Sequence, residues 1–226
     1  MKNVQATFGD IEFQASPRKT RRAAFLEQMD SVAPWADLVA LVEPHRPRGG
    51  GRGRQPWPTE TLLRMYMVQC WFNLSDEATE DALWDSRAVQ AFVGCGEGVP
   101  DATTLLRFRR LLEENSLQEA MLSLVNARLD RAGLLMRGGS IVDASIVEAP
   151  SSTKNARGER DPEMRQTKKG GQYYFGMKVH AAVDAGTGYA VAATFTPANV
   201  HDICELHGLV RESDTVVFAD SGYRGC

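Results

Sequence analysis

Two aspartates stand in segments whose other residues favour a buried β-strand. Asp143 interrupts the apolar run IVDASI (141–146), and Asp220 ends the run VVFAD (216–220). Burying a carboxylate costs several kcal/mol unless something compensates, and two carboxylates on neighbouring strands repel each other. A divalent cation relieves both costs, and Mg²⁺ prefers such hard oxygen ligands. Spacing alone leaves open the alternative of two structural carboxylates, one at a strand end and one in a salt bridge.

Two locally basic segments are candidates for contact with DNA phosphate, although the net charge of the chain is -3. Residues 46–54 read RPRGGGRGR, and residues 154–178 hold more lysines and arginines than acids. Flexible cations neutralise phosphates without reading the base sequence. The candidates in these segments are Arg52, Arg54, Lys154, Lys168 and Lys169. The alternative is a solvated linker followed by a solvated loop.

The elements before residue 136 are predicted to be helical. Residues 1–58 form a weakly structured arm, with one helix near residues 20–29, and a basic linker that contains too much glycine to pack. Residues 59–135 form a helical, helix-turn-helix-like domain. Its helices are expected at 59–72, with Thr59 as the cap, at 76–84, at 86–93, at 102–114 after Asp101, and from a Ser116/Glu119 capping box to Gly133.

The helix after Asp101 is a candidate DNA-recognition helix. Its apolar stripe includes Leu105 and Phe108, whereas Thr104 and Arg107 lie near the exposed N-terminal end. A plain amphipathic helix explains the same pattern equally well.

The period of the sequence changes after Gly139, and residues 136–226 predict a mixed sheet. Strands are expected at 140–147, 173–183, 189–196 and 215–219; the second and third form an antiparallel hairpin, and a helix capped by Asn199 follows them. On the second strand, Lys178 and His180 share one face, where they either contact DNA phosphate or are simply solvated. Asp202 has a structural role as a helix cap or a catalytic one.

Several long motifs occur in the order found in one family of bacterial transposases. VDASIVEAPSSTKN (142–155), DPEMRQTKKGGQYYFGMKVHAAVDAGTG (161–188), TPANVHD (196–202) and FADSGYRG (218–225) closely resemble transposases of the insertion-sequence "five" family, which belong to the DDE class. The upstream helical segment is similar to the N-terminal domain of that family. The resemblance covers residues 15 to 226.

The resemblance implies an α+β (α/β) protein in which a helical DNA-binding domain precedes a ribonuclease H-like catalytic domain. It implies that Asp143 and Asp220 are the first two acids of the DDE triad and ligands of Mg²⁺ or Mn²⁺. The family's third acid is a glutamate further downstream, and this sequence stops at Cys226, before that region. We therefore expect a truncated catalytic domain and no strand cleavage by this chain alone.

The expected partner is the double-stranded DNA of transposon terminal inverted repeats, together with a second copy of the chain or a full-length transposase. The alternative functions are an inactive DNA-binding or inhibitory derivative and a degenerate gene product. The run 62–72 contains Arg64 and is too short to cross a bilayer, and the four cysteines have no paired spacing. These features predict a bacterial, cytoplasmic, nucleoid-associated protein with no membrane partner.

Overall fold

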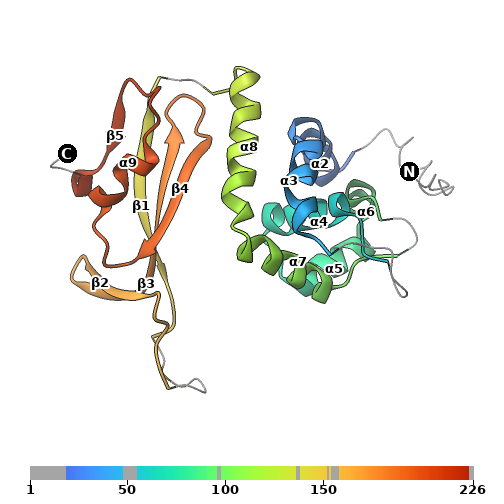
Figure 1. Ribbon diagram of the computed structural model, residues 1–226, viewed down its shortest axis with the longest axis horizontal. Coiled ribbons are helices and arrows are strands. Elements are labelled where there is room, and N and C mark those ends of the chain that lie inside the picture. Colours follow the sequence, from blue (N-terminus) through green and yellow to red (C-terminus); the bar gives the residue numbers. More distant parts are fainter. Residues whose placement is uncertain are drawn as a thin grey trace. The chain divides into compact units, whose positions relative to one another are not determined.

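The computed structural model describes residues 19–47, 55–95, 98–135, 138–151, 153 and 158–223. It divides into two compact units, Met1–Val125 and Asn126–Cys226 (Figure 1). The first unit is helical, and the second contains the sheet. Among the described residues, no helix has both the length and the apolar character needed to cross a membrane.

The helices of the first unit follow the sequence-based expectation closely after residue 58. The helices are α2 (Arg21–Val32), α3 (Trp35–Val42), α4 (Thr59–Phe72), α5 (Asp76–Asp85), α6 (Arg87–Val93), α7 (Ala102–Glu114) and α8 (Leu117–Arg131), with a short 3-10 helix η1 (Glu43–His45) after α3. Asp101 caps α7 as predicted, because its carboxylate accepts a hydrogen bond of 2.6 Å from the Thr104 amide. Two other cap predictions are wrong. Pro58 stands at the N-cap of α4, where Thr59 instead donates to Glu43, and Ser116 has a left-handed φ of 50°.

The segment expected to be a weakly structured arm contributes to the core of the helical unit. Leu26 of α2 is buried in one cluster with Met65 of α4 and Val89 of α6. Leu38 of α3 is buried in a second cluster with Phe108 of α7. The apolar faces of α2 and α3 therefore have partners far along the chain, and the structure does not divide after residue 58.

Two arginines of the helical unit hold helices together. Arg109 of α7 forms a two-pronged ion pair with Asp76 of α5, at 2.7 and 3.1 Å, and this contact, with a hydrogen bond from Gln69, lowers the pKa of Asp76. The Arg64 guanidinium lies 4.3 Å from the centroid of the Trp35 ring and 2.6 Å from Asp30. Both cations are engaged within the fold.

The sheet of the second unit has the strands that the sequence predicts and one short strand more. The strands are β1 (Ser140–Glu148), β2 (Arg165–Lys169), β3 (Gln172–Asp184), β4 (Ala190–Pro197) and β5 (Val217–Ala219), and short helices η2 (Asp202–Glu205), α9 (Leu206–Leu209) and η3 (Ser221–Tyr223) surround β5 in the chain. The expected β3–β4 hairpin is confirmed. Strand β3 also pairs antiparallel with β1 and β2, whereas β5 lies parallel beside β1 (Figure 1).

The face of β3 that carries polar residues is the buried one. His180, Ala182 and Asp184 are fully buried. Leu209 of α9 and Tyr223 of η3 pack there against Val142 and Ala182. The opposite face leaves large apolar side chains exposed, among them Ile141, Phe195 and Phe218. Partners offset part of the cost of burying these polar groups, since His180 Nε2 pairs with the Thr196 hydroxyl at 2.9 Å and Asp184 pairs with Arg211 at 3.1 Å.

Candidate active site

The parallel pairing of β1 and β5 brings Asp143 and Asp220 to adjacent positions. The last paired residues are Val142 and Ala219, and each aspartate is the next residue on its strand. Both aspartates are exposed. One oxygen of each accepts a hydrogen bond of 2.8 Å from a nearby amide, Ala144 for Asp143 and Gly222 for Asp220. These local bonds fix each side chain and leave carboxylate oxygens available to a ligand.

A third carboxylate, Asp202 at the start of η2, lies beside Asp220. A Cβ added to Gly222 would stand 3.0 Å from an oxygen of each, so these two oxygens are separated by no more than twice that distance. Asp202 also accepts a hydrogen bond of 2.7 Å from Lys178, which donates to the Val200 carbonyl as well. The helix predicted after Asn199 is present as η2 and α9, over residues 202–209, but His201 and not Asn199 stands at its N-cap.

Tyr223 lies near the three carboxylates of this region. The ring is almost completely buried, and burial, followed by the charges of Asp202, Asp143 and Asp220, raises the pKa of its hydroxyl to about 12. Burial is the largest cause of this rise in pKa, and the three carboxylates add to it. The carboxylates themselves give this region negative charge, which attracts cations. No local pattern singled out Tyr223 beyond its place in the FADSGYRG motif.

The described residues offer hard oxygen ligands but no complete metal cage. Among them, no three His, Cys, Asp or Glu side chains lie close enough together to hold a metal ion. Asp143 and Asp220 have the chemistry that Mg²⁺ prefers, whereas Lys178 already neutralises Asp202. The site therefore fits a cation held by two carboxylates, with water or phosphate oxygens in its remaining positions.

Lys178 and His180 occupy positions unsuited to the predicted phosphate contact. The Lys178 side chain is 12% exposed in its ion pair with Asp202, and the His180 side chain is fully buried. Burial, reinforced by the charge of Lys178 and opposed by that of Asp202, lowers the pKa of His180 and keeps the ring neutral near pH 7. Both side chains instead face Asp202, Lys178 at 2.7 Å and the His180 ring at 3.9 Å.

The other predicted DNA contacts fall into three groups. Arg107 is exposed and Thr104 half-buried on α7 of the helical unit. Lys168 and Lys169 are exposed at the end of β2 in the sheet unit. Arg52, Arg54 and Lys154 lie outside the described residues.

A helical unit followed by a unit with a mixed sheet is an α+β architecture. The comparisons with known proteins place the chain in the class of DNA transposases. Residues 13–111 match the family model described as Transposase domain (DUF772), and residues 135–225 match the model described as Transposase DDE domain. The chain therefore belongs to the insertion-sequence transposases of the DDE class. No solved structure matches it.

Proposed function

We propose that this transposase uses Asp143 and Asp220 to hold Mg²⁺ or Mn²⁺ for cleavage and transfer of the DNA strands at the ends of its insertion sequence. One observation carries the proposal: the parallel β1–β5 register ends at Val142 and Ala219, so that Asp143 and Asp220 follow at adjacent backbone positions. The strand order β2-β3-β1-β5, with β4 paired to β3 and with only β5 parallel, supports a ribonuclease H-like fold for the second unit.

The neighbouring residues keep the two aspartates ready for a cation. Lys178 holds Asp202 in an ion pair, so that this third carboxylate adds little repulsion beside Asp220. Gly222 permits the close approach of Asp202 and Asp220, because any Cβ at this position would crowd one oxygen of each carboxylate. When bound, the divalent ion would stabilise charge on the oxygens of the scissile phosphate.

Metal binding provides the direct test of this site. We expect the double variant Asp143→Asn/Asp220→Asn to bind Mn²⁺ at least about tenfold more weakly than the wild type in calorimetric titration, since each change removes an anionic ligand. Glu212→Gln is the control, because it removes an exposed carboxylate of the same unit away from the pair. Equal affinities for the wild type and the double variant would refute the proposed ligands.

We further propose that the helical unit binds the double-stranded DNA of the terminal inverted repeats through α7. Arg107 is exposed on this helix, whereas Arg109 is committed to Asp76. A side chain that is free of internal ion pairs is the better candidate for a phosphate or base contact.

Arg107→Ala is expected to weaken binding of inverted-repeat DNA by about fivefold to tenfold near 0.1 M salt, the effect of losing one phosphate contact. The slope of log affinity against log salt should fall by about one unit in magnitude. An electrophoretic shift titration measures both quantities. Arg21→Ala, at an exposed position on α2, is the matched control. Binding by Arg107→Ala that equals the control at every salt concentration would remove α7 from the interface.

A further inference from the structure

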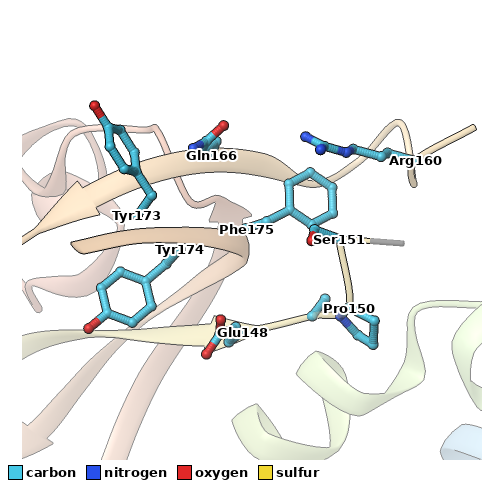
Figure 2. A pocket seen from close by; sticks show the side chains of 9 residues that line it. Glu148, Pro150, Ser151, Arg160, Gln166, Tyr173, Tyr174 and Phe175 are labelled. Atoms are coloured by element: carbon cyan, nitrogen blue, oxygen red, sulfur yellow. The ribbon is translucent and has the colours of Figure 1, made fainter. Parts of the chain in front are cut away.

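A pocket at the end of β1 and β3 has no part in the carboxylate site. Its volume is about 640 Å³. The walls come from the chain that follows β1, from Arg160, from Gln166 of β2, and from Tyr173 to Phe175 of β3. Figure 2 shows the Phe175 ring beside Arg160 and close to Ser151, while Tyr173 and Tyr174 extend from opposite sides of β3. A cavity of this size accommodates a small organic ligand.

Two cations lie over aromatic rings of this pocket, one within its lining and one beside it. The Arg160 guanidinium lies 5.4 Å from the centroid of the Phe175 ring. The Lys168 ammonium lies 5.3 Å from the centroid of the Tyr173 ring, which is 62% exposed. The β2–β3 pairing causes this arrangement, because it sets Lys168 opposite Tyr173 and Gln166 opposite Phe175 on one face of the hairpin. Large exposed rings beside cations are the features with which proteins hold single-stranded nucleic acid.

We propose that this pocket binds an unpaired nucleotide of single-stranded DNA. The base stacks on the Phe175 or Tyr173 ring, and Arg160 and Lys168 neutralise the adjoining phosphates. Glu148 lines the opposite wall (Figure 2). Its carboxylate repels phosphate but accepts hydrogen bonds from the N–H groups of a base, so the sugar-phosphate backbone runs along the Arg160 side.

The position of the pocket relates it to the carboxylate pair. On β3, Tyr173 and Phe175 share the face of Ala181, the residue paired with Asp143. Phe175 is six residues from Ala181, or about 20 Å at a rise of about 3.3 Å per residue. This inference rests on the proposed function, in which DNA lies at the carboxylate pair.

Fluorescence anisotropy with labelled oligothymidine tests the pocket, and a duplex of equal length serves as the second probe. We expect Tyr173→Ala and Phe175→Leu each to weaken oligothymidine binding by at least about fivefold, because each removes a stacking surface. Phe175→Leu keeps an apolar side chain in place and so guards against a folding defect. Tyr189→Ala, an exposed tyrosine of the same unit outside the pocket, should bind like the wild type.

A second measurement locates the nucleotide. Oligothymidine with one 5-iododeoxyuridine should photo-crosslink to Tyr173 or Phe175, as identified by mass spectrometry, and Arg160→Met should lower the yield. Crosslinks elsewhere, or equal oligothymidine affinity for the pocket variants and Tyr189→Ala, would overturn the pocket while duplex binding persists. Equal losses for both probes in the pocket variants would also overturn it, because the pocket would then not favour unpaired DNA. Failure of the wild type to bind either probe would instead contradict the proposed function.

Discussion

Asp143→Asn is expected to reduce Mg²⁺-dependent nicking of a supercoiled plasmid carrying the insertion-sequence ends by at least about a hundredfold to a thousandfold. The assay uses a fusion of this chain to the glutamate-bearing segment of a complete DDE transposase, because the family resemblance implies that a glutamate acts with the two aspartates in strand cleavage. Asparagine has almost the shape of aspartate, and its side-chain oxygen can still accept the hydrogen bond from the Ala144 backbone N–H. The loss therefore reports the missing charge, not a misfolded strand.

Two further variants make this result specific. Asp220→Asn should cause a loss of the same order, since Asp220 directly follows β5 at the position adjacent to Asp143. Asp161→Asn, an exposed aspartate far along the chain from both strands, should nick like the parent fusion. If the Asp143→Asn fusion nicks at the parent rate, the carboxylate pair has no role in strand cleavage.

Arg211→Met is expected to destabilise the sheet unit by about 3–5 kcal/mol, the usual cost of removing one partner of a buried ion pair. The Arg211 guanidinium contacts two carboxylates whose side chains are fully buried, Asp214 at 2.7 Å and Asp184 at 3.1 Å. The Ser140 hydroxyl, at the start of β1, donates to Asp214 at 2.6 Å. Without Arg211, two buried carboxylates, Asp184 at the end of β3 and Asp214 just before β5, would lose their counter-ion.

Hydrogen exchange followed by mass spectrometry measures this effect in the peptides of β1 and β3, where amide protection should fall by about two orders of magnitude or more. Arg131→Met is the control. Its guanidinium bonds a carbonyl within its own helix, so its effect should stay within about 0.5 kcal/mol. Full protection of the strands in Arg211→Met would show that the ion cluster does not hold the sheet together.

Acid provides a second readout for the same cluster. Burial raises the pKa of Asp184, but hydrogen bonds from Thr187, Arg211 and Gly186 outweigh it and lower the pKa below its ordinary value. The pKa of Asp214 is lowered in the same way, with burial opposed by Ser140 and Arg211. Depressed carboxyl pKa values stabilise the fold above the unfolded value of about 3.9. The stability of the wild-type sheet unit should therefore be lost as pH falls through the lower, folded pKa values.

The elements of the fold were largely predictable from local patterns. Apolar periodicity and the Gly186-Thr187-Gly188 turn sufficed to predict α4 to α7 and the β3–β4 hairpin, and the Asp101 cap marked the start of α7, because each signal acts within a few residues. Recognition of the two aspartates came from motifs in the chain. The helix expected near residues 20–29 is present as α2, but α3 and the packing of both helices in the core were missed, because their partners lie far along the sequence.

The sequence by itself thus determined the transposase class, the two candidate acids and the order of the elements. Only the tertiary structure decided which face of β3 is buried. An alternating strand separates two faces, but the packing of α9 and η3 selects the polar one, where Asp184 finds Arg211. The tertiary structure also decided that Lys178 is an internal partner of Asp202, and that Asp202 stands beside Asp220. Pairing between distant strands and the direction of each side chain create these contacts, and neither is encoded in local spacing.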